Sequence, residues 1–407
     1  MTKSTKALKP TSATGRQPVS RAASSAKSKG GKAATKSKPT SKTKAANKAA
    51  AAKAKKATPS KVKKVTRSSA KVAPKAAPKV SPKTAAKSAP AKATPKAPVT
   101  KSVAKTDEKL PVFLGLSPKY SSAASARVHV IPVPYEHTTN YKQGTADGPR
   151  AILDASQEVE LFDDELWIEP FKIGVHTAEP IDMARVQSGE SKPFQSLYEA
   201  VKPLVDTDKF PLVIGGEHSL TLGAVRACAE RHKDLSILQV GAHCDLRPAY
   251  EGDPYSHASI GYRLYESLPN PLITQVGVRN VSWQEARWME TETPKINIYW
   301  ARMQDKWNFN EIVNTLSDNV YLSIDVGGLD SGIMPSTGSP EPGGMNWYQL
   351  MELIKHVCVR KNVVGADIVE LSPIAGLHAP DFLVAKLAYK LIGYRFALEL
   401  GVTKKYV

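Results

Sequence analysis

The sequence predicts an α/β protein in which a mainly parallel, eight-stranded sheet is covered by helices on both faces, giving three α/β/α layers. Two observations lead to this fold class. Eight short apolar runs of strand length occur between residues 127 and 369, and uninterrupted apolar runs are typical of strands that are buried on both faces. Helix-length segments separate many of these runs, and this alternation favours parallel strands joined by crossover helices.

Each element is placed from its local sequence. Strands are predicted at the apolar runs 127–133, 171–175, 210–214, 235–240, 272–278, 296–299, 320–326 and 363–369. The first helix is predicted at 148–156, because Pro149 suits an early helical position. The remaining helices are predicted at 194–205, 220–231, 311–316, 347–359 and 381–400.

Residues 1–106 differ in composition from the rest of the chain. They contain 26 Lys and 3 Arg but no acidic and no aromatic residue, so their charge is about +29. Because the whole chain has a net charge of +19, residues 107–407 carry about −10. Such a segment cannot bury enough apolar surface to offset its ordering entropy. We therefore expect a disordered, basic Lys/Ala/Pro-rich tail before a single α/β domain, residues 107–407.

The charge of this tail predicts binding to nucleic acid or another polyanion through counterion release. A role in solubility alone, or contact with the acidic domain, is the alternative. Three cysteines suggest a reducing compartment, no apolar run reaches the roughly 18 residues of a membrane span, and no secretory signal core follows the first charges. The expected location is cytoplasmic, with nucleoid or chromatin association through the tail.

Polar side chains follow three of the predicted strands. His218 comes after the strand at 210–214, His243 and Asp245 come after the strand at 235–240, and Asp325 ends the strand at 320–326. Carboxyl ends of parallel strands meet at one edge of a sheet, so these four side chains should lie together. Imidazole and carboxylate donors suit a divalent ion such as manganese. The alternative to a metal site is a polar loop with a capping Asp and a core histidine.

Four ordered blocks resemble the ureohydrolase superfamily of arginases and agmatinases, and the agmatinase branch most. They are GGEHS from Gly215, GAHCDLRPAYEGDPYSHA from Gly241, SIDVGGLDSGIMPSTGSPEPGG from Ser323 and DIVELSP from Asp367. The resemblance implies an arginase-like fold, trimers or hexamers, and hydrolysis of a guanidino compound, as in agmatine to putrescine plus urea.

The resemblance also implies roles for individual residues. His218, Asp245 and Asp325 match ligands of one manganese ion, and His243 and Asp325 match ligands of a second. His257 matches the histidine that shuttles a proton in catalysis, and Glu370 matches the carboxylate that binds the guanidinium group of the substrate.

Two positions depart from the family pattern. Gly241 and Gly327 stand where the family blocks carry aspartate metal ligands, so we expect one tightly held ion per chain at most and an impaired rate. Cys244 lies between two of the predicted ligands, although a lone buried thiol is more often inert. Two functions stay open: an agmatinase-like hydrolase, or a degenerate homologue that binds a ligand or partner while the basic tail binds nucleic acid.

Overall fold

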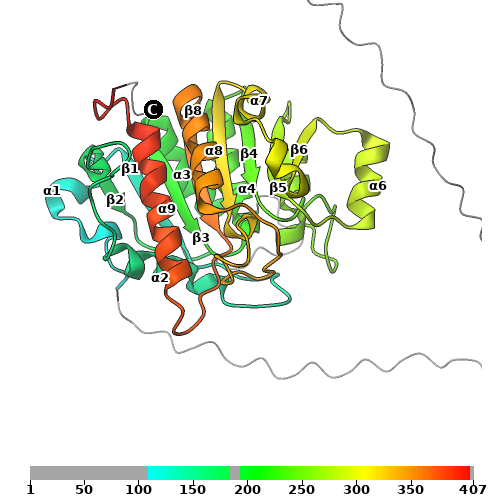
Figure 1. Ribbon diagram of the computed structural model, residues 1–407, viewed down its shortest axis with the longest axis horizontal. Helices are drawn as coiled ribbons and strands as arrows, with labels where there is room; N and C mark the ends of the chain where they lie inside the picture. The colour runs from blue at the N-terminus through cyan, green and yellow to red at the C-terminus, as the bar shows by residue number, and fades with distance from the viewer. Residues whose placement is uncertain (1–108, 184–192, 404–407) are drawn as a thin grey trace, which may run out of the picture. The chain divides into compact units, whose positions relative to one another are not determined.

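The computed structural model describes residues 109–183 and 193–403 (Figure 1). The predicted tail, residues 1–106, lies outside the described residues. Within the described part, no helix is long and apolar enough to cross a membrane.

In the described residues, a single parallel sheet of eight strands forms the centre of the domain, in the order β2-β1-β3-β8-β7-β4-β5-β6. The strands are β1 (Val128–Val133), β2 (Val175–Thr177), β3 (Phe210–Gly215), β4 (Ser236–Val240), β5 (Ile273–Val278), β6 (Ile296–Trp300), β7 (Asn319–Asp325) and β8 (Asn362–Val369). Asp325 pairs with Val369, and Ile324 pairs with Val240. The carboxyl ends of β8, β7 and β4 are therefore level at one edge.

Helices cover both faces of this sheet, with α8 and α9 on the near face in Figure 1 and α3 and α4 behind it. Alternate strand residues point to opposite faces, so Leu212 and Ile214 of β3 enter one apolar cluster while Val213 enters the other. The helices are α1 (Pro118–Ser121), α2 (Gly148–Ser156), α3 (Gln195–Asp206), α4 (Thr221–Arg231), α5 (Ile260–Ser267), α6 (Trp283–Glu292), α7 (Phe309–Asn314), α8 (Trp347–Arg360) and α9 (Ala379–Phe396).

The predicted fold class is confirmed, and seven of the eight predicted strands lie within two residues of their observed positions. The second strand was placed wrongly at 171–175. Residues Pro170–Ile173 form a 3₁₀ helix, and Gly174 turns the chain with a φ of 86° before β2 begins at Val175. Phe171 and Val175 are both buried, which explains why the apolar run looked like a strand.

Candidate active site

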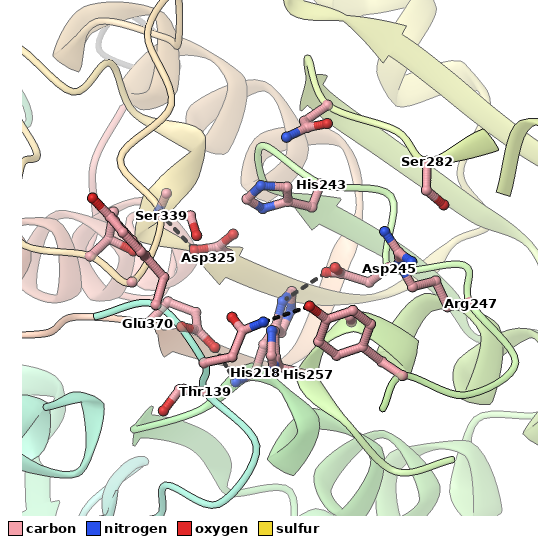
Figure 2. A pocket seen from close by; sticks show the side chains of 18 of the residues that line it. Thr139, His218, His243, Asp245, Arg247, His257, Ser282, Asp325, Ser339 and Glu370 are labelled. Atoms are coloured by element: carbon pink, nitrogen blue, oxygen red, sulfur yellow. Dashed lines mark hydrogen bonds and ion pairs between the residues drawn. The ribbon is translucent and has the colours of Figure 1, made fainter. Parts of the chain in front are cut away.

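All six predicted site residues line one cavity of about 220 Å³ beyond the carboxyl ends of the central strands. The chain brings them there from four neighbouring strands: β3 leads to the 3₁₀ helix His218–Leu220, β4 leads to the loop at 241–245, Asp325 ends β7, and Glu370 follows β8. Figure 2 shows their side chains around a common space. The residues are His218, His243, Asp245, His257, Asp325 and Glu370.

Two of these residues have left-handed backbone conformations, which are uncommon for residues other than glycine. The φ angle is 53° at Asp245 and 70° at Glu370. The Glu370 N–H donates to the Gly216 carbonyl at 2.8 Å, and Glu370 Oε1 accepts the His218 N–H at 2.6 Å. These bonds hold both strand ends in register, and residues in strained conformations concentrate at functional sites.

His218 is buried at the base of the cavity and has a defined partner for each ring nitrogen. Its Nδ1 lies 3.5 Å from Asp245 Oδ2. Its Nε2 lies 3.0 Å from Ser323 Oγ, which donates to the buried carboxylate of Asp367 at 2.7 Å. Burial lowers the pKa of His218, but Asp245, Asp325 and Asp367 outweigh it and raise that pKa to about 9. Nδ1 is the ring nitrogen that faces Asp245 of the cavity.

Asp325 lies between the two glycines that depart from the family pattern. Its Oδ1 accepts the Gly327 N–H at 2.7 Å, and burial raises its pKa against the opposing effect of His218 and His243. A Cβ atom added at Gly241 would lie 3.2 Å from Asp325 Oδ2, and one added at Gly327 would lie 2.9 Å from Oδ1. Carboxylates at these two positions would therefore approach Asp325 from both sides.

The metal-binding potential of the cavity is limited by this arrangement. Among residues 109–183 and 193–403, no three His, Cys, Asp or Glu side chains lie close enough together to hold a metal ion. His218 and Asp245 form a pair, whereas Asp325 is turned to Gly327. The half-buried His243 has its Nε2 at 3.9 Å from Glu341 Oε1.

Cys244 does not contribute a thiolate to the cavity. It is fully buried and packs with Leu246 and Val278 in a separate apolar cluster. Burial raises the pKa of its thiol far above the usual range. Its position fits the expectation that this cysteine is inert, and the His, Asp and Glu side chains that line the cavity offer nitrogen and oxygen donors.

His257 also lines the cavity, at the start of the 3₁₀ helix His257–Ser259. Its Nδ1 lies 2.9 Å from the hydroxyl oxygen of Thr138, and its ring packs edge to face on Tyr250 with centroids 5.8 Å apart. Asn140 donates to the Tyr250 hydroxyl at 2.5 Å. Residues 139–142 line the cavity, so this loop forms a wall of the site, which the sequence prediction did not anticipate.

Positive side chains also reach the cavity. Arg247 lies over the Tyr250 ring at 5.0 Å from its centroid, and Lys142 donates to the Ser372 carbonyl at 2.7 Å. Burial lowers the pKa of Lys142. The cavity thus has an acidic interior around Asp325 and Glu370 and basic groups in its lining.

The sequence model of the arginase family matches residues 126–393 of this chain. The chain belongs to the arginase family. Within that family it is 36% identical over 283 residues to the N(1)-aminopropylagmatine ureohydrolase of Synechocystis, covering 67% of this chain and 90% of that protein.

Solved structures of arginase-family proteins agree with the fold. The agmatine ureohydrolase of Thermoplasma volcanium superposes with a TM-score of 0.59 at 29% identity, covering 68% of this chain and 92% of that one. The arginase of Bacillus caldovelox superposes with a TM-score of 0.56 at 20% identity, covering 67% and 98% of the two chains. The predicted arginase-like fold and the agmatinase-like branch are both confirmed.

Proposed function

We propose that this arginase-family chain hydrolyses a guanidino compound of the agmatine type and releases urea. The observation that carries the proposal is the convergence of the six predicted site residues from four strands on one cavity. Similar proteins are named agmatine ureohydrolase and N(1)-aminopropylagmatine ureohydrolase. Agmatine is the first substrate to test, and its aminopropyl derivative is the second.

Glu370 is proposed to bind the guanidinium group of the substrate. Its carboxylate is buried, and burial together with the neighbouring Asp325 raises its pKa well above the usual range, against the opposing effect of His218. A bound guanidinium would place a cation directly against this carboxylate, and its planar N–H groups match carboxylate geometry. Substrate binding and the charge on Glu370 should therefore favour each other.

His257 is proposed to transfer a proton to the leaving amine. It lines the same cavity as Glu370, and a positioned imidazole can accept and return a proton near neutral pH. Loss of the imidazole should lower the turnover number more than it changes substrate binding.

The nitrogen and oxygen donors also suit one divalent ion, with manganese the expected metal. His218, Asp245 and Asp325 would hold it, provided that Asp325 releases the Gly327 N–H, and His243 lies beside this set. Such an ion would supply hydroxide near neutral pH. Because Gly241 and Gly327 offer no carboxylate, we propose one ion per chain at most.

A urea-release assay tests the proposed activity. The full chain would be incubated with manganese and with agmatine, N(1)-aminopropylagmatine or a guanidino acid, beside the variants His257→Asn and Glu370→Gln. Urea from agmatine or its aminopropyl derivative in the unaltered chain, with strong loss in both variants, is the expected result. An absence of urea from every guanidine would instead support the degenerate, ligand-binding homologue.

We also propose that residues 107–407 form the enzyme domain and that the basic segment 1–106 binds nucleic acid or another polyanion, on the strength of its charge alone. Assembly into trimers or hexamers is proposed from the family resemblance, and light scattering during gel filtration would measure it. A cytoplasmic location, with nucleoid or chromatin association through 1–106, completes the proposal.

A further inference from the structure

Glu217 is a fully buried carboxylate next to the cavity with four hydrogen-bond donors around it. Its Oε2 accepts the backbone N–H groups of His137 at 2.7 Å and Thr138 at 2.6 Å. Its Oε1 accepts the hydroxyl groups of Thr138 at 2.7 Å and Ser219 at 2.5 Å. An ionised carboxylate only accepts and has about four lone-pair sites, so these four donors fill it.

This arrangement fixes the direction of the Thr138 hydroxyl. A hydroxyl has one hydrogen and two acceptor lone pairs, and the hydrogen of Thr138 is committed to Glu217. Two groups of His257 contact the same oxygen: the backbone N–H at 3.0 Å and the ring Nδ1 at 2.9 Å. The backbone N–H can only donate. If Nδ1 carried no hydrogen, two lone pairs would face each other at 2.9 Å.

Ser256 carries a second hydroxyl near this nitrogen, with Oγ at 3.4 Å from His257 Nδ1. Its oxygen also accepts the Ala258 N–H at 3.3 Å. This longer contact is compatible with a hydrogen on Nδ1, and it does not relieve the clash of lone pairs at Thr138.

We propose that Glu217 and Thr138 are positioning residues that hold neutral His257 as its Nδ1–H tautomer, with the Nε2 lone pair left for the reaction. Nε2 makes no hydrogen bond to any residue in the described ranges, and His257 lines the cavity. During hydrolysis Nε2 accepts a proton from the attacking water and returns it to the leaving nitrogen as the C–N bond breaks. Nδ1–H keeps its bond to Thr138 throughout. The inference rests on the proposed function of His257.

The tautomer can be measured without turnover. Two-bond ¹H–¹⁵N correlation spectra of ¹⁵N-histidine-labelled full chain, recorded without manganese to avoid paramagnetic broadening, distinguish Nδ1–H from Nε2–H rings, and the His257→Asn variant assigns the signal. We expect the Nδ1–H pattern in the unaltered chain. An Nε2–H pattern there would overturn the inference, whatever the urea assay shows.

Glu217→Gln makes a sharper prediction. The backbone N–H groups of His137 and Thr138 require the amide oxygen, so the amide nitrogen must face the Thr138 hydroxyl. That hydroxyl then accepts from Gln and turns its hydrogen to Nδ1, and His257 changes to the Nε2–H tautomer. The turnover number should fall by about 10- to 100-fold, part of the ~10²- to 10⁴-fold that a positioned proton-transfer group supplies, while KM changes little.

Substitutions of Thr138 provide the matched pair. Thr138→Val keeps the shape but removes the hydroxyl, so the fixed tautomer and about 10-fold or more of the turnover number should be lost. Thr138→Ser retains the hydroxyl and should restore the Nδ1–H pattern and most of the lost rate. Equal rates and identical tautomers in the Val and Ser variants would overturn the inference. A chain that releases no urea would refute the proposed activity, and the spectra would still decide which tautomer His257 adopts.

Discussion

Aspartates at positions 241 and 327 should convert the cavity from at most one metal ion to two. The structure permits the backbone of both substitutions, since neither glycine has a positive φ angle. The added Cβ atoms would lie 3.2 Å and 2.9 Å from oxygens of the Asp325 side chain, which is the flexible end of that residue. Gly241→Asp and Gly327→Asp together should therefore fit after a rotation of Asp325.

The double substitution changes the free energy of unfolding in two opposing ways. Rotation of Asp325 breaks its 2.7 Å bond to the Gly327 N–H, worth about 1.5–3 kcal/mol for a charged acceptor, and leaves three carboxylates together. The metal-free double variant should thus unfold more easily than the unaltered chain. Manganese at 100 times its dissociation constant would return about 2.7 kcal/mol, or about 5 °C in melting temperature at roughly 2 °C per kcal/mol.

Metal analysis and melting curves with and without manganese test this reasoning. After dialysis we expect no more than one manganese per unaltered chain, about two per double variant, and a rate of urea release at least about 10²-fold higher in the double variant. The two substitutions need not act additively, because both change one centre. Two tightly held ions in the unaltered chain, or a double variant that manganese does not stabilise, would show that the coordination is assigned wrongly.

Three further predictions concern Glu370, His129 and the basic segment 1–106. Glu370→Gln should raise KM for agmatine by about 10- to 100-fold, the value of a charged hydrogen bond, as steady-state urea release would show. Burial, with the charges of His176 and Lys209, lowers the pKa of His129 from 6.5 to about 4. Between these pH values the unfolded chain binds a proton at His129 and the folded chain does not, so stability falls as pH drops from 6.5 to 4. His129→Phe should flatten that part of the profile in denaturant titrations, and an unchanged slope would contradict the assignment. Deletion of residues 1–106 should leave the melting temperature unchanged and abolish salt-dependent DNA or RNA binding measured by fluorescence anisotropy.

The inner strands were predictable because a parallel strand buried on both faces is mostly apolar. Isolated errors came from elements with a weaker pattern. Helix α6 is mostly polar and was missed, although the capping box formed by Ser282 and Glu285 marks its start in the sequence. Helix α5 was missed as well, because it has only 8 residues and its buried positions are Ile260, Gly261 and Leu264 alone.

The candidate site was predictable where residues follow strand ends and match family blocks, as His218 and Asp325 do. Thr138 and Glu217 were missed for a physical reason. Their contacts join positions that are 79 and 119 residues apart in the chain, and no local periodicity encodes such pairs. The sequence did carry a signal for Glu217. An acidic residue that directly follows a buried strand and precedes a predicted ligand needs hydrogen-bond donors around its carboxylate.

The sheet order has a consequence for how this cavity forms during folding. Strand β8 is inserted between β3 and β7, so the central strands close only after the chain has been made as far as residue 369. Pairing over such sequence distances is slow, because loop-closure entropy is lost before the contacts form. His218 meets Glu370 across 152 residues, so a nascent or truncated chain lacking β8 has no assembled cavity. Substrate binding that appears during refolding would therefore mark the last step of sheet assembly, not an early one.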